Sequence, residues 1–326
     1  MLERLVRRAA RPLMRRIDHY LSAAIRRNSA ELHDELSKIN LKLREVASRQ
    51  GVPAARSYYY LGKNRALTQL SNGLPFYVNT DDRGISPWVI MIGGWETFVD
   101  TVLTRLCREN MRVCDLGANL GYYTIKLAHL VGAGGYVLAL EPNPELFPFL
   151  RDSVELNGFS ARVRIENLAA GAESGSLVLN YADTNMGGGN LFGLPPHMSP
   201  RTSEVGVVAV DDLVQDERGF DLIKIDVEGW ESQVIKGMAR TLEKSAHASI
   251  VTEVSWPQWS QSGDPSSQLR NLIGARDGVF IIHHDGSLER VPLTNLDRFH
   301  TVGVCYALLT HWTQEHAERL QDLIRT

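Results

Sequence analysis

The sequence contains little cysteine and no long apolar run. Its 326 residues include three cysteines, Cys107, Cys114 and Cys305, which are far apart and form no Cys-x-x-Cys pair. This pattern supports neither a disulfide framework nor a zinc site, so we expect no metal and a reducing cytoplasm as the setting. No apolar run approaches the ~20 residues of a membrane-spanning helix. The arginine-rich N-terminus also lacks the continuous apolar core of a signal peptide.

Basic residues are concentrated at the N-terminus. Residues 1–27 carry eight arginines against Glu3 and Asp18, so the net charge of −3 divides into +6 for this segment and −9 for the rest. An acidic body repels a polyanion, so no nucleic acid is expected as substrate or partner. Two interpretations of the basic segment stay open: a solvated helix, or an amphipathic helix in peripheral contact with anionic lipid, which Pro12 would interrupt. The second would make the protein membrane-associated.

A helical pattern occupies residues 13–48. Within it, apolar residues are spaced 4, 3, 4 and 3 apart, as in coiled-coil heptads: Leu32, Leu36, Ile39, Leu43 and Val46. Only about two heptads are regular, fewer than the three or four that define a coiled coil. A helix over residues 21–48 that forms a homo-oligomer and a helix that packs on its own domain both fit. We therefore expect a helical N-terminal extension over residues 1–50.

From residue 111 to 326, short apolar segments alternate with helical patterns, which predicts a doubly wound α/β domain. Residues 51–110 form a lead-in region, with short strands near 58–60 and 74–79 and a helix over 93–107. The strands expected in the main domain are 112–116, 136–141, 162–167, 222–226 and 249–254, with two more beyond residue 277. A C-terminal helix follows them.

The stretch VCDLGANLGYYT, residues 113–124, predicts a ligand site after the first strand of this domain. Asp115 falls at the carboxyl edge of the strand, where open α/β sheets bind ligands. Gly117 and Gly121 allow the turn to pass close to a ligand. A dinucleotide fingerprint would need glycine where the sequence has Asn119 and Tyr122. Asp115 would also repel phosphate, whereas it suits a ligand with an amine or a sulfonium.

The next two strand ends add candidate ligand contacts. Glu141 ends the second strand, where a carboxylate can accept hydrogen bonds from two vicinal ribose hydroxyls; a solvated strand-end acid is the alternative. Asn143 is expected to cap the following helix. Asn167 and Ala169 close the third strand, where small residues either leave room for an adenine ring or simply pack a helix on the sheet.

The stretch DLIKIDVEGWE, residues 221–231, places two further carboxylates at the same edge of the sheet. Asp226 ends the fourth strand and Glu228 follows in the loop, so one can orient a ligand while the other acts as a general base. A divalent metal with water ligands is the weaker alternative. Lys224 is expected to form an ion pair with a neighbouring acid. His197 and His283 are less favoured as the base, because a lone histidine is more often structural.

One segment is biased in composition. Residues 185–203, NMGGGNLFGLPPHMSPRTS, are rich in glycine, proline and serine and predict a loop too long for a simple connection. A lid over the acceptor and a plain surface loop are both compatible with this composition.

In this order, the motifs resemble the FkbM-type family of S-adenosylmethionine-dependent methyltransferases. The resemblance covers roughly residues 80–256 and rests on GGWE (93–96), CDLGANLGYYT (114–124), EPNP (141–144), LAAG (168–171) and, above all, IKIDVEGWE (223–231). It implies a Rossmann-like class I methyltransferase sheet, mostly parallel with an antiparallel C-terminal strand. It also implies S-adenosyl-L-methionine as cofactor and methyl transfer to a hydroxyl of a sugar, glycan or polyketide.

The resemblance further implies roles for the residues at the strand ends. The expected cofactor-binding set is Asp115, Gly117, Ala118, Asn119, Gly121, Glu141, Asn143, Asn167 and Ala169. Within it, the glycine motif lines the methionine part of the cofactor and Glu141 holds the ribose. Asp226 and Glu228 are expected at the reaction centre, and the resemblance does not settle which is the base.

Two other functions are alternatives: a catalytically inactive scaffold of the same fold, and a nucleotide-sugar oxidoreductase. Four convergent acids argue against the first, and the missing glycines argue against the second. A base methyltransferase would need an Asn/Asp-Pro-Pro-aromatic turn, whereas residues 226–230 read Asp-Val-Glu-Gly-Trp. The expected partner is a small-molecule or glycan acceptor, which is free, nucleotide-linked or lipid-linked.

Overall fold

The computed structural model describes residues 57–182, 185–190, 200–214, 218–261 and 263–325. The basic segment 1–27, the heptad pattern and the rest of the expected N-terminal extension lie outside these residues, as does His197. The predictions made for them stay predictions.

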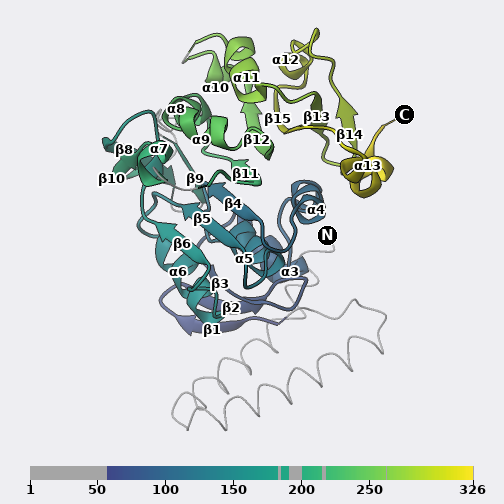
Figure 1. The fold of residues 1–326 in the computed structure, drawn as a ribbon. Coiled ribbons are helices and arrows are strands. Elements are labelled where there is room, and N and C mark those ends of the chain that lie inside the picture. The colour runs from purple at the N-terminus through teal and green to yellow at the C-terminus, as the bar shows by residue number, and fades with distance from the viewer. Residues whose placement is uncertain (1–56, 183–184, 191–199, 215–217, 262, 326) are drawn as a thin grey trace, which may run out of the picture. The chain divides into compact units, whose positions relative to one another are not determined.

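An eight-stranded sheet forms the centre of the described region (Figure 1), with the order β14-β13-β15-β12-β11-β4-β5-β6. Its strands are β4 (Arg112–Leu116), β5 (Tyr136–Leu140), β6 (Val163–Glu166), β11 (Leu222–Ile225), β12 (Ser249–Ser255), β13 (Gly278–Ile282), β14 (Leu288–Arg290) and β15 (Val304–Thr310). Strands β4, β5, β6, β11 and β12 are parallel, and β15 runs antiparallel between β12 and β13. This confirms the predicted mostly parallel, Rossmann-like sheet with an antiparallel C-terminal strand.

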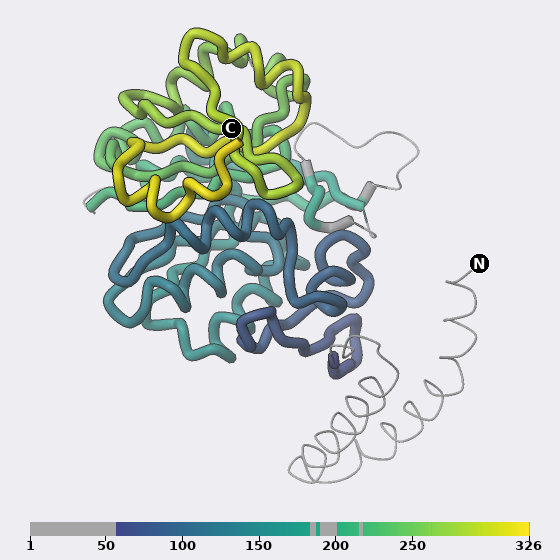
Figure 2. The backbone as a smooth tube through the Cα atoms, turned by 90° about the vertical axis from the view of Figure 1, so that its right-hand side faces the viewer, coloured from purple at the N-terminus to yellow at the C-terminus, as the bar shows by residue number. Residues whose placement is uncertain are grey.

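The order of strands reverses in the middle of the sheet. The chain builds outward from β4 through β5 to β6, then returns to add β11 on the other side of β4 and continues outward to β12. Figure 2 shows the result: the blue and teal segments lie below, and the green and yellow segments lie above. Such a switch point leaves a crevice at the carboxyl ends of the strands, where ligands bind in this class of sheet.

Both faces of the sheet are covered by helices. Along β4, Val113 packs into one apolar core, whereas Cys114 and Leu116 pack into the other, as the period of two of a strand requires. The first face is covered by α4 (Thr97–Leu106), α5 (Tyr122–Leu130), α6 (Phe147–Leu156) and α13 (Gln314–Leu320). The second is covered by α7 (Val210–Leu213), α8 (Glu231–Gly237), α9 (Ala239–Lys244), α10 (Trp256–Trp259), α11 (Pro265–Ile273) and α12 (Arg298–Val302). Burial on both faces explains the near-continuous apolar character of the central strands.

Two smaller sheets flank this core. One is the antiparallel sheet of β1 (Tyr59–Gly62), β2 (Arg65–Gln69) and β3 (Pro75–Asn79), which is followed by helix α3 (Ile85–Ile92). The other has the order β7-β10-β8-β9 and contains β7 (Ala169–Ala170), β8 (Gly175–Ala182), β9 (Asn185–Asn190) and β10 (Pro200–Val208). A short 3-10 helix, η1 (Gln321–Leu323), follows α13.

Two predicted helix starts are wrong. The helix expected from Gly93 begins only at Thr97, because Gly93 adopts φ 69° and ends α3, so that GGWE forms the turn between two helices. Asn143 does not cap α6, which begins at Phe147. Its side chain instead accepts a hydrogen bond from the N–H of Glu145 at 2.9 Å, which forms a turn before the helix.

The predicted loop at 185–203 is also partly wrong, because its ends are strands. Residues 185–190 form β9, and residues 200–203 begin β10. A glycine in a strand often marks a close approach of other groups. A Cβ on Gly187 would lie 2.0 Å from Asn119 Nδ2. The segment 191–199 lies outside the described residues.

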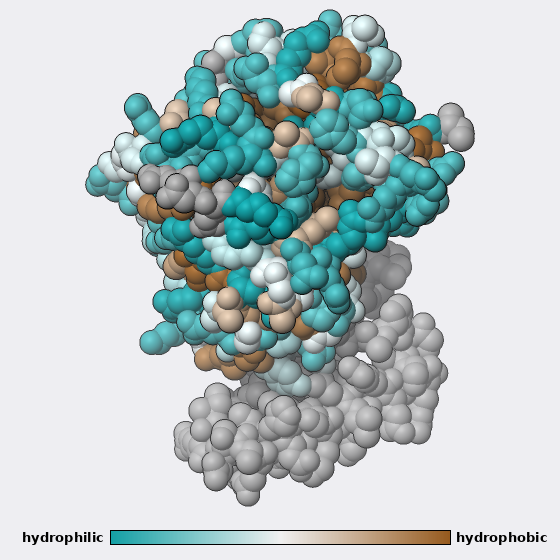
Figure 3. Space-filling model, viewed as in Figure 1, coloured by the Kyte–Doolittle hydropathy of each residue, from teal (hydrophilic) through white to brown (hydrophobic). Residues whose placement is uncertain are grey.

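The three cysteines are free and buried. Burial raises the pKa of Cys107 and of Cys305 to about 12, and raises that of Cys114 as well. No helix in the described part of the chain has the length and apolar character needed to cross a membrane. The face shown in Figure 3 is mostly hydrophilic, with small, separate hydrophobic patches.

Candidate active site

A cavity of about 220 Å³ opens where the carboxyl ends of β4, β5 and β11 meet. Because Leu116 pairs with Leu140 on one side and Ile225 on the other, the next residue of each strand reaches the same edge. Most of the predicted site residues line this cavity: Gly117, Ala118, Asn119, Glu141, Asn143, Ala169, Asp226 and Glu228. Asp115, Gly121 and Asn167 are described but do not line it.

Gly117 packs closely against the end of β11. The N–H groups of Gly117 and Ala118 both donate to the carbonyl of Leu140, at 3.0 and 2.9 Å. Gly117 adopts φ +81°, and a Cβ on it would lie 1.8 Å from the carbonyl oxygen of Asp226. A glycine is therefore required here both for its left-handed backbone and for the packing of this turn against the end of β11.

We expect Gly117→Ala to be less stable than Gly158→Ala, although both add a methyl group at positive φ. At Gly158, with φ +68°, no described atom lies within 4 Å of the added Cβ, so only the backbone strain of about 1–2 kcal/mol applies. At Gly117 the clash with Asp226 adds to that strain. Urea unfolding of the two variants measures the difference, and equal losses would contradict the packing role.

Gly121 and Asn167 do not line the cavity but lie next to the segments that do. Gly121 adopts φ +94°, and a Cβ there would lie 2.6 Å from Leu150 Cδ1, so this glycine allows α5 to pack on α6. Asn167 Nδ2 donates to the carbonyls of Glu141 at 2.8 Å and Pro142 at 3.1 Å. Gly121 thus allows close helix packing, and Asn167 holds the backbone that follows β5 in place.

Glu141 is held by two backbone amides. Its Oε2 accepts from the N–H of Asn119 at 2.7 Å, and its Oε1 accepts from the N–H of Asn143 at 2.8 Å. Burial raises the pKa of Glu141 to about 7, although these two amides lower it. Each carboxylate oxygen has a second lone pair, so the group can still accept from a hydroxyl in the cavity.

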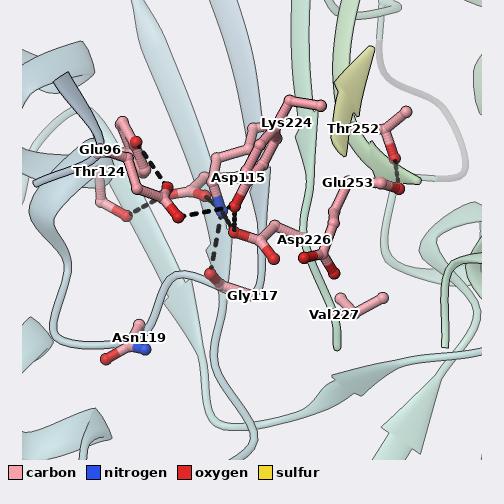
Figure 4. Close-up of polar contacts among 12 residues, drawn as sticks. Glu96, Asp115, Gly117, Asn119, Thr124, Lys224, Asp226, Val227, Thr252 and Glu253 are labelled. Atoms are coloured by element: carbon pink, nitrogen blue, oxygen red, sulfur yellow. Dashed lines mark hydrogen bonds and ion pairs between the residues drawn. The ribbon is translucent and has the colours of Figure 1, made fainter. Parts of the chain in front are cut away.

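Lys224 lies at the centre of the site (Figure 4), and its side chain is 2% exposed. Its Nζ lies 3.3 Å from Asp226 Oδ2 and 3.6 Å from Asp115 Oδ1, and it donates to the carbonyl of Gly117 at 3.3 Å. Burial lowers the pKa of Lys224, but Asp226, Asp115 and Glu96 raise it more, so that it lies above its ordinary value. The predicted ion pair of Lys224 is therefore confirmed. Asp115 takes part in it without lining the cavity.

Asp115 is fully buried. Its Oδ2 accepts a hydrogen bond from Thr124 Oγ1 at 2.6 Å, whereas its Oδ1 accepts none from the described part of the chain. Lys224 is thus the cation that stabilises this buried charge, and the two residues together fix the floor of the site.

Carboxylates outnumber cations around the cavity. Glu96, Asp226, Glu228 and Glu253 line it together with Lys224. Burial is the largest effect on the three glutamates, followed by the nearby Asp226, and their pKa values rise to about 7 for Glu96, 8 for Glu228 and 10 for Glu253. Figure 4 shows the carboxylates of Asp226 and Glu253 facing one another. A bound cation would be stabilised by such a group of acids.

Sequence reasoning missed four residues of the site. Glu96 and Glu231 stand in motifs that carried the resemblance, GGWE and IKIDVEGWE, but received no role. Glu231 Oε1 accepts from the N–H groups of Val227 and Gly229 at 3.1 and 3.2 Å, so it holds the loop that carries Glu228. Glu253 and Tyr306 come from β12 and β15 and stand in no motif.

Within the described residues, no group of three His, Cys, Asp or Glu side chains is arranged to hold a metal ion.

Comparison with known proteins supports the family that the strand-end motifs indicate. The profile of the methyltransferase FkbM domain matches residues 115–282. A comparison with curated proteins finds no match. A solved structure of methyltransferase FkbM from Methylobacillus flagellatus KT is similar, with 17% identity and a TM-score of 0.40. The match covers 61% of this chain and 43% of that one, and so spans less than half of that protein.

Two further solved structures are similar to the chain. One is a SAM-dependent O-methyltransferase from Thermotoga maritima, with 13% identity and a TM-score of 0.39, covering 80% of this chain and 87% of that one. The other is a precorrin-6y C5,15-methyltransferase from Geobacter metallireducens GS-15, with 14% identity and a TM-score of 0.37, covering 65% and 87%. The family match spans half of the sequence and includes the strand ends that line the cavity, and the chain belongs to the FkbM methyltransferase family.

Proposed function

We propose that the protein is an S-adenosylmethionine-dependent O-methyltransferase that acts on a hydroxyl of a sugar, glycan or related small molecule. The observation that carries the proposal is the position of Glu141 and Asp226. They line one cavity from strand ends on either side of β4, at the switch point of the sheet.

The residues of the cavity fit this cofactor. Glu141 would accept hydrogen bonds from the ribose hydroxyls, since two backbone amides already fix its orientation. Ala169 and Ala170 leave room beside it for a flat adenine ring. The acidic groups around Lys224 would stabilise a sulfonium. When bound, the cofactor supplies a methyl group that is electrophilic because it is attached to a positively charged sulfur.

Asp226 is the carboxylate that we assign as general base. The Lys224 ammonium, 3.3 Å from its Oδ2, stabilises its negative charge, so it is available to accept a proton from an acceptor hydroxyl. Glu228 lines the same cavity, and burial raises its pKa to about 8. It is therefore largely protonated at neutral pH and is suited to hold the acceptor by hydrogen bonding.

The cavity suits an acceptor with several hydroxyl groups. Carboxylates accept hydrogen bonds from vicinal hydroxyls, and Trp95 adds an apolar ring surface beside them. The acceptor panel described below therefore contains free, nucleotide-linked and lipid-linked sugars.

The test is titration calorimetry with S-adenosylmethionine, S-adenosylhomocysteine and NAD, on the wild type and on Glu141→Gln. We expect the first two to bind and the variant to bind them about 10–100-fold more weakly, because a hydrogen bond to a charged group contributes about 1.5–3 kcal/mol. Glu166→Gln is the matched control, since Glu166 ends the neighbouring strand β6 and pairs with Arg164 at 2.8 Å outside the cavity.

Two results would count against the proposal. Failure of the wild type to bind either cofactor form would favour the inactive scaffold, and tight binding of NAD would favour the oxidoreductase. If the cofactor binds, release of S-adenosylhomocysteine is then followed with a panel of free, nucleotide-linked and lipid-linked sugars. Turnover with no hydroxyl compound of this panel would reject the acceptor class.

A further inference from the structure

The hydroxyl of Tyr306 lies between two carboxylates. Its Oη is 2.9 Å from Glu96 Oε1 and 3.1 Å from Asp226 Oδ2, both within hydrogen-bond distance. A phenol carries one proton and can donate to only one of these oxygens. With both carboxylates ionised, the second contact would place a lone pair of Oη against a charged oxygen. The arrangement forms two hydrogen bonds only when one carboxyl group carries a proton.

The surroundings favour Glu96 as the holder of that proton. Lys224 Nζ lies 3.3 Å from Asp226 Oδ2 and forms an ion pair with it, whereas no cation is paired with Glu96 among the described residues. Burial and Asp226 raise the pKa of Glu96 to about 7, although Lys224 and the hydroxyls of Tyr306 and Tyr123 lower it. Glu96 is thus close to half-protonated at neutral pH, where it can both gain and release a proton.

The elements around Tyr306 hold this geometry. Glu96 has φ 40°, a left-handed conformation that is strained for a glutamate and occurs mainly where surrounding structure enforces it. Its other oxygen, Oε2, accepts from Tyr123 Oη at 3.0 Å. The ring of Phe98 packs edge-on against the ring of Tyr306, with their centroids 5.9 Å apart. Residues of α4, α5 and β15 therefore fix the carboxyl group of Glu96 and the hydroxyl of Tyr306.

We propose that Asp226, Tyr306 and Glu96 form a proton relay in which Glu96 finally receives the proton of the acceptor hydroxyl. This inference rests on the function proposed above. The O–H bond of the acceptor breaks, and its proton binds Asp226 as the acceptor oxygen bonds to the methyl carbon. The C–S bond breaks, and its electron pair stays on sulfur.

Asp226 then passes the proton to Tyr306 Oη, and Tyr306 gives its own proton to Glu96. Tyr306 ends with one proton, as it began, and Asp226 is again a carboxylate. Glu96 lines the same cavity, so it can return its proton to solvent after the products leave. In this scheme Asp226 is the catalytic base, whereas Tyr306 and Glu96 carry the proton away from it.

The relay is tested first without an acceptor, by ¹³C NMR titration of glutamate carboxyls in the protein with S-adenosylhomocysteine. The Glu96 signal is assigned as the one lost in Glu96→Gln. Tyr306→Phe removes a hydrogen-bond donor to the carboxylate, so we expect the Glu96 pKa to rise. Asp226→Asn removes a neighbouring negative charge, so we expect it to fall. Tyr181→Phe is the control, because its hydroxyl bonds Glu145 at 3.2 Å outside the cavity.

The second arm is the pH dependence of turnover with the acceptor that the sugar panel identifies. Since ionised Glu96 is the form that accepts the proton, kcat of the wild type should rise with pH through about 7. Tyr306→Phe should lower kcat on the order of tenfold and remove this rise, with KM for the acceptor nearly unchanged. Tyr181→Phe should keep the wild-type profile.

The results separate this relay from the proposed function. If Tyr306→Phe and Asp226→Asn leave the Glu96 titration unchanged, or if Tyr306→Phe keeps the wild-type pH profile, the relay is rejected even when the cofactor binds. If S-adenosylmethionine and S-adenosylhomocysteine do not bind the wild type, the proposed function is rejected, and so is the relay that rests on it.

Discussion

Asp226→Asn is expected to lower kcat by about 10²–10⁴-fold, which is the range for loss of a general base. The amide keeps the shape of the side chain but cannot take the proton of the acceptor. Binding of S-adenosylhomocysteine, which lacks the sulfonium charge, should persist, because Glu141 and the Gly117 turn are unchanged. Single-turnover measurement of methyl transfer separates this loss of rate from any change in binding.

Two controls accompany Asp226→Asn. Asp212→Asn makes the same chemical change at an exposed residue that pairs with Arg240 at 3.4 Å, and it should keep full activity. Glu228→Gln should raise KM for the acceptor more than it lowers kcat, since Glu228 is assigned to holding the acceptor. If Glu228→Gln loses the larger share of kcat and Asp226→Asn the smaller, the two roles are reversed.

Lys224→Met is expected to lower the free energy of unfolding by about 3–5 kcal/mol, as is typical when one partner of a buried ion pair is removed. The reason is Asp115, which is fully buried and would be left without its cation. Urea unfolding followed by circular dichroism measures the loss. Arg218→Met, which breaks an exposed pair with Asp221, should cost less than about 1 kcal/mol.

A double variant distinguishes loss of charge pairing from loss of packing. Adding Asp115→Asn to Lys224→Met removes the uncompensated charge, so part of the lost stability should return. A double variant that is no more stable than Lys224→Met alone would show that the lysine stabilises the fold by some other route.

The central sheet could be predicted from the sequence because its pattern is local. Each of the five parallel strands was predicted to within one residue at either end, since apolar runs bounded by turn residues mark buried strands. The predictions of helix starts failed at Gly93 and Asn143, where the choice depended on backbone angles and turn hydrogen bonds. Such choices involve small energies, and the residue type alone does not decide them.

The candidate site was predictable only where its residues stand in motifs. Tyr306 comes from β15, which enters the sheet antiparallel beside β12 and brings its hydroxyl to Asp226 across a separation of 80 residues. No local sequence pattern predicts a contact between residues so far apart in the chain.

Gly117 and Gly121 illustrate another limit of prediction from the sequence. Both have positive φ, but one adjoins Asp226 and the other adjoins Leu150, and only the packing distinguishes them.

The reactivity of the three buried thiols reports local opening of the structure. Only the thiolate reacts readily with alkylating reagents, and burial keeps Cys107, Cys114 and Cys305 protonated and largely shielded from solvent. Cys114 lies in β4 at the middle of the sheet, Cys305 lies in β15, and Cys107 follows α4. The rate at which each is alkylated therefore measures how often its own part of the structure opens, without any engineered label.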